Sequence, residues 1–169
     1  MAFRPVSIKV RALQWLSQRE HSRMELRLKL MRLLSASEAA AAQNRDTDAA
    51  GEPSAEAEVV QLLDWLTSHG YLSAERFVES RVHARQTRFG NRRIDQELRQ
   101  HGLALAPDAR QALQATELER AREVWRKKYG QTAGDAAGRA RQGRFLVGRG
   151  FTADVVRRVV QGLSDDNGA

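Results

Sequence analysis

The sequence has no cysteine, and only three of its 169 residues are proline. Without cysteine, the chain can form neither a disulfide framework nor a thiolate zinc site, and it has no cysteine nucleophile. Aromatic residues are scarce, at 6%. No apolar run approaches the roughly 20 residues that span a bilayer, and the first residues lack the apolar segment of a signal peptide. We therefore expect a cytoplasmic protein with no membrane contact.

Residue groupings typical of enzymes and metal sites are also lacking. The four histidines are far apart, and none has a second ligand at helical spacing. There is no GxxxxGK phosphate loop, and no strand precedes the glycine-rich segment 134–150, as a dinucleotide fold would require. Neighbouring carboxylates such as Glu117 and Glu119 are more typical of solvated faces or ion pairs than of an acid/base pair. We expect no enzyme, no metal and no cofactor.

Positive charge is what the chain has in excess. Lysine and arginine total 28 against 21 aspartate and glutamate, which gives a net charge of +7 and a pI of about 10.7. Residues 120–158 hold eleven cations and only three carboxylates, so the C-terminal part is the most basic. Such a balance favours a polyanionic partner or an acidic protein surface.

Apolar residues recur at intervals of three and four along nearly the whole chain, which predicts an all-α fold. Ser22 and Ser73 are placed to cap helices, because a serine hydroxyl accepts a hydrogen bond from a free backbone N–H, and a further helix is predicted to start near Ser54. Gly70 and Gly130 follow apolar-periodic segments and predict helix ends. The predicted helices are about 6–18, 23–34, 54–69, 74–89, 91–102, 107–116, 117–129, 137–149 and 152–163.

The segment 36–58 differs in composition from the rest of the chain. It carries six carboxylates against a single arginine, Arg45, and it contains few large apolar side chains. A segment of this kind buries too little apolar surface to offset its ordering entropy. We expect an acidic, flexible insertion at about 36–56.

An internal repeat organises the chain. Three positions separated by 68 and 48 residues are each followed, four and eight residues later, by a similar pattern, and the acidic insertion accounts for most of the difference between the two spacings. The matching sets are Ser22, Leu26 and Leu30; Gly90, Ile94 and Leu98; and Gly138, Gln142 and Leu146. The pattern predicts three tandem repeats of three helices each.

The repeats predict the domain boundaries and the shape. The first unit is 1–72 with the acidic insertion, the second is 73–116, and the third is 117–169 with a frayed tail. A unit of this size buries little core alone, so neighbouring units should stack into an elongated, curved molecule. We expect a monomer whose long faces suit a groove or a filament better than a small substrate.

Two groups of cations are candidates for functional sites. On a helical wheel Arg81, Arg85 and Arg88 border the apolar face of the central helix; they either reach out to a ligand or pair with carboxylates at a structural seam between units, and we favour the seam. Other cations lie away from apolar stripes and predict a binding surface, although a basic solvated face explains them about equally well. These are Arg92, Arg93, Arg120, Arg126, Lys127, Lys128, Arg139 and Arg144.

The three tryptophans, Trp15, Trp65 and Trp125, sit on apolar stripes. We interpret them mainly as core residues that give the units their shape. Base-stacking platforms are the alternative that the same residues allow.

Four stretches together resemble the RecX family of bacterial modulators of the RecA recombinase. They are ALQWLSQREHSRMELRLKL, GYLSAERFVESRVHARQTRFGNRRIDQEL, VWRKKYG and RFLVGRGF, and the similarity covers most of 6–163. It implies a negative modulator that binds in the groove of the RecA–DNA filament, where it inhibits filament extension, ATP hydrolysis, strand exchange and coprotease activity. Single- or double-stranded DNA is a further possible contact of the basic faces. The insertion at about 36–56 is longer than the family pattern. The alternative is a stand-alone DNA-binding helical regulator.

Overall fold

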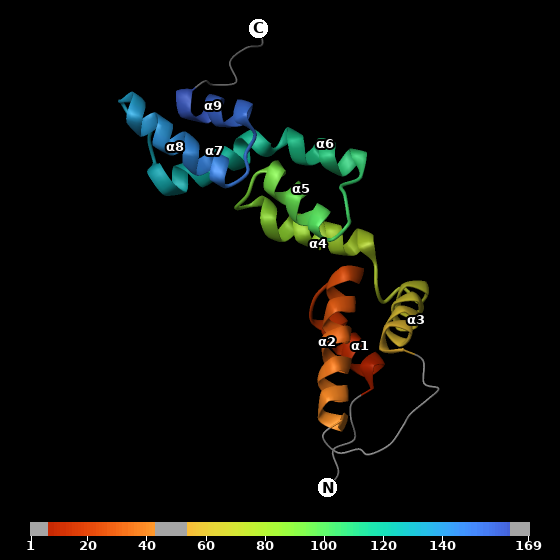
Figure 1. The fold of residues 1–169 in the computed structure, drawn as a ribbon. Coiled ribbons are helices and arrows are strands. Elements are labelled where there is room, and N and C mark those ends of the chain that lie inside the picture. Colours follow the sequence, from red (N-terminus) through yellow and green to blue (C-terminus); the bar gives the residue numbers. More distant parts are fainter. Residues whose placement is uncertain (1–6, 43–53, 163–169) are drawn as a thin grey trace. The chain divides into compact units, whose positions relative to one another are not determined.

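The structure, a computed structural model, describes residues 7–42 and 54–162 (Figure 1). This part of the chain contains nine helices and no strand, which confirms the all-α prediction. The helices are α1 (Ile8–Gln18), α2 (Arg23–Ala42), α3 (Ala55–Ser68), α4 (Ala74–Gln86), α5 (Asn91–Gln100), α6 (Pro107–Ala115), α7 (Glu117–Tyr129), α8 (Ala136–Gly148) and α9 (Ala153–Gln161).

The chain divides into two structural units. Unit 1 is Met1–Phe77 and contains α1, α2 and α3. Unit 2 is Val78–Ala169 and contains α5 to α9, and the division falls within α4.

Local sequence signals set most helix ends. The two predicted serine caps are confirmed: the hydroxyls of Ser22 and Ser73 accept from the backbone N–H three residues further on, at 3.0 and 3.2 Å. Ser54, near which a helix was predicted to start, caps α3 in the same way at 3.3 Å. Gly70 has a φ of 74° after α3, a left-handed conformation that other residues rarely adopt. The predicted stops at Gly70 and Gly130 are therefore confirmed.

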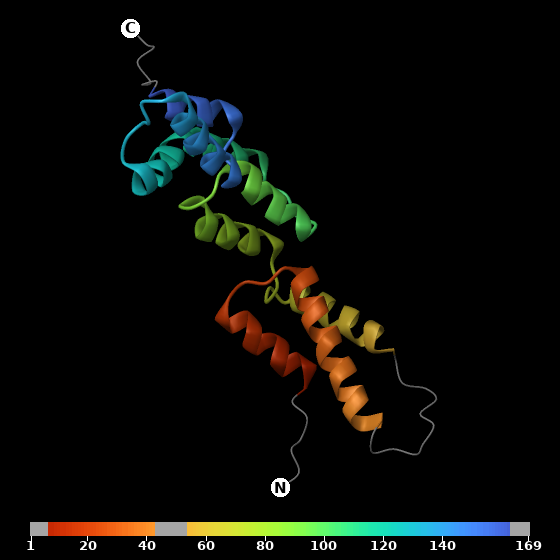
Figure 2. The ribbon, with the colours of Figure 1, turned by 60° about the vertical axis from the view of Figure 1, so that its left-hand side comes forward.

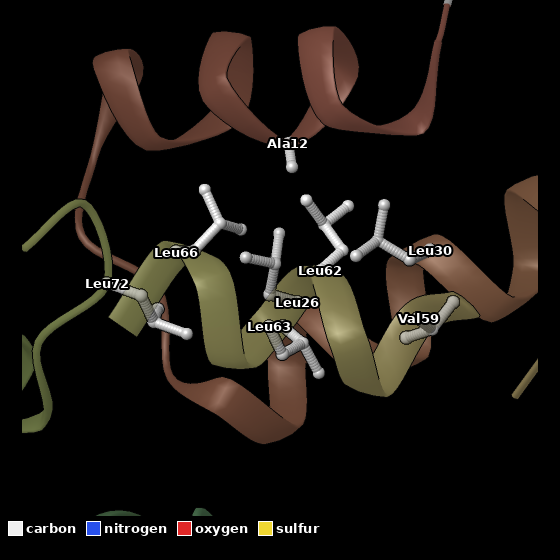
Figure 3. Close-up of a cluster of buried hydrophobic side chains, with 8 residues drawn as sticks. All are labelled: Ala12, Leu26, Leu30, Val59, Leu62, Leu63, Leu66 and Leu72. Carbon is white, nitrogen blue, oxygen red and sulfur yellow. The ribbon is translucent and has the colours of Figure 1, made fainter. Parts of the chain in front are cut away.

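The core of unit 1 lies where α1, α2 and α3 meet. Figure 3 shows its eight buried side chains converging from the three helices and from the segment that follows α3. α1 brings a small residue, Ala12, into the core, where its side chain points toward those of the other two helices (Figure 3). Trp15 and Trp65 pack against the edge of this cluster, which confirms their interpretation as core residues.

The main core of unit 2 lies among α7, α8 and α9, the teal and blue helices of Figure 2. α9 contributes four valines to it, and Trp125 of α7 packs against its edge. The positions that match in the repeat, four and eight residues on, are all buried. They are Leu26 and Leu30 in α2, Ile94 and Leu98 in α5, and Gln142 and Leu146 in α8.

Several helix ends differ from their predicted places. α4 ends at Gln86 rather than at residue 89, and a turn over 87–88 leads to Gly90, whose N–H bonds the Arg149 carbonyl. α2 continues to Ala42, past the predicted start of the insertion at about 36. Four consecutive alanines, 39–42, have the highest helix propensity of any residue and explain the extension. The predicted flexible middle of the insertion, at 43–53, and most of the predicted tail, at 163–169, lie outside the described residues.

A histidine is buried in unit 1, just before α2. His21 is 2% exposed, with its Nδ1 3.0 Å from the carbonyl oxygen of Arg19 and its Nε2 3.1 Å from the Lys29 ammonium. The ammonium can only donate, so Nε2 accepts and Nδ1 carries the hydrogen of a neutral imidazole. Burial lowers the pKa of His21 below its ordinary 6.5; the nearby charges of Arg19 and Lys29 lower it further, whereas the hydrogen bond to Arg19 and the charge of Glu25 act against this.

We expect acid to destabilise unit 1 through His21. The unfolded chain takes up a proton near pH 6.5 and the folded chain only at lower pH, so stability present above pH 6.5 is lost as the pH falls through the folded pKa. The loss is at most about 1.4 kcal/mol per pH unit, since one proton is involved. Urea unfolding between pH 7.5 and 5.5, followed by tryptophan fluorescence, measures it. His21→Asn, which cannot titrate there, should show a shallower dependence; an equal slope in both proteins would contradict this assignment.

Candidate functional site

The first turn of α7 holds a buried carboxylate at the centre of unit 2. Glu117 is only 3% exposed. Its Oε1 accepts from the backbone N–H groups of Asn91 at 3.0 Å and Thr152 at 3.2 Å, and its Oε2 accepts from the Thr152 hydroxyl at 3.0 Å. These residues stand at the amino ends of α5 and α9, where a negative charge complements the helix dipole. Glu117 was predicted on a solvated face or in an ion pair, and its burial shows that the solvated face is wrong.

Arg120, one turn after Glu117 on α7, donates to carbonyl groups at the carboxyl ends of other helices. Its guanidinium donates to the carbonyl oxygens of Gln86 (3.1 Å), Phe89 (3.0 Å) and Leu113 (2.9 Å), beyond or near the ends of α4 and α6, and to Asn91 Oδ1 (2.6 Å). Burial lowers its pKa, and the charge of Glu117 opposes that shift. The position of Arg120 away from the apolar stripe of α7 predicted an exposed cation. Arg120 is instead half-buried and hydrogen-bonded within the protein.

Two glycines join the α4–α5 corner to the α8–α9 corner. The Gly90 N–H donates to the Arg149 carbonyl at 3.0 Å, and the Arg92 N–H donates to the Gly150 carbonyl at 3.0 Å. A Cβ atom on Gly90 would lie 2.3 Å from backbone atoms of Phe151, and one on Gly150 would lie 2.5 Å from the Arg93 Cβ. The two corners can approach this closely only because both positions lack side chains.

Arginines gather around Phe89 at this join. The guanidinium carbons of Arg85, Arg88, Arg93 and Arg149 lie 5.6, 5.9, 4.9 and 5.5 Å from the centre of its ring. The ring face attracts cations and holds the four side chains near one another despite their like charges. Nearby carboxylates balance part of the charge: Glu97 accepts from Arg85 at 2.9 Å and lies 3.9 Å from Arg93. Arg85 therefore pairs with a carboxylate of unit 2, and its predicted role at a seam between units stays a prediction.

An open cleft adjoins this cluster, between α5 and the end of α8. It has a volume of about 640 Å³, and we call it the arginine cleft. Three cationic side chains face one carboxylate there, so a negatively charged group would be favoured over a cation. The lining residues are Arg92, Arg93, Asp95, Gln96, Arg99, Val147, Gly148 and Gly150.

The other predicted binding residues lie on α7 and α8. Arg126, Lys127 and Lys128 are exposed in the last turn of α7, where cations also complement the negative end of the helix dipole. Arg144 is exposed on α8. Arg139 is less accessible, because its guanidinium donates to the carbonyl oxygens at positions 133 and 134, at 3.2 and 2.7 Å.

Most of these cations make no ion pair. Among the residues that the structure describes, no carboxylate pairs with Arg92, Arg126, Lys127, Lys128 or Arg144. Arg88 is also exposed and has no carboxylate partner among the described residues. Arg81 is half-buried and has an interaction partner. An exposed cation without a partner can bind an external carboxylate or phosphate without first breaking an internal ion pair.

Sequence reasoning missed several residues of this region. Phe89, Arg99 and Arg149 were not predicted as parts of a site, and Glu117 was predicted on a solvated face or in an ion pair. Phe89 and Gly90 do stand together in the sequence, as do Gly150 and Phe151. That repeated Phe and Gly pairing is the only sequence signal for the join, and it does not show that the two pairs meet.

Two features, a metal site and a membrane-spanning helix, are not found among the described residues. In residues 7–42 and 54–162, no three histidine, aspartate or glutamate side chains gather as a metal site would require. Within the same ranges, none of the helices has the length and apolar character for crossing a bilayer.

Three-helix units in tandem with a basic surface are typical of helical-repeat proteins, and comparison with known proteins identifies the family. Residues 75–113 match the second three-helix domain of RecX, and residues 115–160 match the third. The chain is 44% identical to the regulatory protein RecX of Ralstonia nicotianae, over 96% of this chain and 93% of that one. The chain therefore belongs to the RecX family of regulatory proteins.

Further comparisons agree with this assignment. The regulatory protein RecX of Leptothrix cholodnii is 46% identical, over 92% of this chain and 88% of the other. The crystal structure of RecX from Lactobacillus salivarius has a TM-score of 0.62 over 92% of this chain and 94% of that one, at 17% sequence identity. The structural comparison shows that the fold is shared.

Proposed function

We propose that this protein is a negative modulator of the RecA recombinase, without enzymatic activity of its own. It would bind in the groove of the RecA–DNA filament and inhibit filament extension, ATP hydrolysis, strand exchange and coprotease activity. Membership of the RecX family supports a regulatory role. The observation that carries the proposal is the set of exposed cations of unit 2 that have no carboxylate partner among the described residues.

The proposed contact surface consists of the arginine cleft and the basic surfaces of α7 and α8. Arg92 and Arg93 act in the cleft, and Arg126, Lys127 and Lys128 act at the end of α7. Arg144 is a further candidate on α8, whereas Arg139 and Arg120 act mainly within the protein. Both the acidic side chains of a protein filament and the phosphates of its DNA are ligands for these groups.

We expect the double variant Arg126→Glu with Lys127→Glu to relieve inhibition of RecA strand exchange. Reversing two exposed charges replaces attraction to an acidic surface by repulsion, and we expect about a tenfold higher concentration for half-maximal inhibition. The inhibition should also depend less steeply on salt. Strand-exchange assays with RecA and the purified variant provide the measurement, with circular dichroism to confirm folding.

The matched control is Arg11→Glu with Arg32→Glu, which changes the net charge equally but lies on α1 and α2 of unit 1. It should inhibit nearly as well as the wild type if the α7 cations form the contact. Full inhibition by the folded α7 variant would remove these residues from the site. Binding to RecA filaments and to bare duplex DNA at matched salt separates filament modulation from stand-alone DNA binding.

A further inference from the structure

Two aromatic rings stack on a third on the surface of unit 1. The ring of His69 stacks on that of Trp65 at 4.2 Å between centroids and 24° between planes. The ring of Tyr71 stacks on Trp65 at 5.6 Å and 17°. Trp65 packs against the core of unit 1, whereas His69 and Tyr71 are exposed, with 48% of Tyr71 accessible. The indole thus supports two outer rings that face solvent.

Hydrogen bonds fix the chain that carries the outer rings. His69 Nδ1 lies 2.9 Å from the Trp65 carbonyl oxygen, to which it donates. The Tyr71 N–H donates to the Leu66 carbonyl at 2.9 Å, and Arg76 donates to the Tyr71 carbonyl at 3.1 Å. Because the backbone of this turn is already ordered, a ligand that stacks on the rings loses little chain entropy.

A cation stands beside the rings. The Lys9 ammonium of α1 lies 3.4 Å from the centre of the Trp65 ring. The ammonium, the His69 ring and the Tyr71 ring all contact the indole, which leaves little of the indole itself open to a ligand. Trp65 is therefore a support, and the surfaces open to a ligand are those of His69 and Tyr71.

We propose that His69 and Tyr71, supported by Trp65, form a stacking platform for the unpaired bases of a single-stranded nucleic acid. A nucleobase can stack on the solvent side of either outer ring, and base–aromatic stacking tolerates any sequence because every base has a π-face. The Lys9 ammonium and the net charge of +7 attract the phosphates that accompany the bases. The same charges disfavour the other common stacking group, an arginine of a protein partner.

This site goes beyond the proposed modulation of RecA. It belongs to unit 1 and uses ring stacking, whereas the contact proposed above uses the cations of unit 2. The two proposals can therefore fail separately.

The test compares two fluorescein-labelled strands of equal length and charge, a 15-nucleotide thymidine oligomer and an abasic oligomer with the same phosphates. Fluorescence anisotropy at fixed salt gives both dissociation constants. We expect the wild type to bind the thymidine strand roughly tenfold more tightly, because base stacking supplies the difference. The double variant His69→Ala with Tyr71→Ala should lose most of that preference and keep its affinity for the abasic strand.

Three further variants make the test specific. Tyr71→Phe keeps the ring and should keep the preference. Met24→Ala with Leu28→Ala removes two exposed apolar side chains from α2 of the same unit and should also leave it unchanged. The Arg126→Glu and Lys127→Glu variant should weaken binding to both strands and preserve their ratio. Equal binding of both strands by the wild type, or an undiminished preference in the folded double alanine variant, would overturn the proposal.

Discussion

Replacing Gly90 by alanine should destabilise unit 2 by about 3 to 5 kcal/mol, as the combined cost of overpacking and of two lost hydrogen bonds. The new Cβ would lie 2.3 Å from the N and Cα atoms of Phe151 and 2.4 Å from the carbonyl carbon of Gly150. These are backbone atoms, so no side-chain rotation relieves the overlap. The corners must separate, which breaks the hydrogen bonds from Gly90 to Arg149 and from Arg92 to Gly150.

The φ of Gly90 is −79°, a conformation open to any residue, so the expected loss is steric. Urea unfolding followed by circular dichroism measures it. Gly148→Ala is the matched control: it lies at the end of α8 with nothing within 4 Å of its added Cβ. We expect it to be neutral or to stabilise by up to about 1 kcal/mol, because alanine favours the helix. An unchanged unfolding midpoint for Gly90→Ala would show that the corners are not held together as described.

Glu117→Ala should cost about 3 to 5 kcal/mol, the usual effect of removing one charge from a buried polar network. The substitution leaves the N–H groups of Asn91 and Thr152 buried without an acceptor, and it removes the carboxylate that favours the charged form of Arg120. Glu117→Gln retains one acceptor oxygen but brings an N–H₂ group toward donors. We therefore expect it to destabilise as well, although by less.

Glu119→Ala provides the comparison on the same helix turn. Its side chain is 60% exposed and pairs with Arg122 at 3.5 Å, so its loss should change the free energy of unfolding by less than about 0.5 kcal/mol. Amide NMR adds a local readout: the resonances of Asn91 and Thr152 should shift strongly in Glu117→Gln and little in Glu119→Ala. Similar unfolding curves for the two alanine variants would contradict the capping role of Glu117.

Features determined by neighbouring residues were predictable from the sequence. Serine caps act three residues along the chain, and Gly70 ends α3 through its own backbone conformation. The apolar stripe of a helix identifies its buried side, because burial repeats with the helical period. The all-α fold and the buried repeat positions follow from these local rules.

The polar centre of unit 2 was not predictable in this way. Glu117 meets Asn91 and Thr152, which are 26 and 35 residues away. A helical wheel of α7 places Arg120 off the apolar stripe, but it cannot show that the ends of α4 and α6 cover that side. A polar residue capped by distant helix ends has the same sequence pattern as a solvated one. The sequence shows where the cations are. It does not show that four arginines group around Phe89, because that grouping depends on the α4–α5 corner meeting the α8–α9 corner.

The paired roles of Glu117 and Arg120 have a consequence for how unit 2 folds. A single turn of α7 satisfies backbone groups at the amino ends of α5 and α9 and near the carboxyl ends of α4 and α6. A tandem array whose modules contact only through their surfaces can lose them one at a time. Here, backbone groups at the ends of α4, α5 and α6 are hydrogen-bonded by side chains of α7, the helix that begins at residue 117. Unit 2 should therefore unfold as one cooperative block, with its two sequence repeats inseparable in the transition.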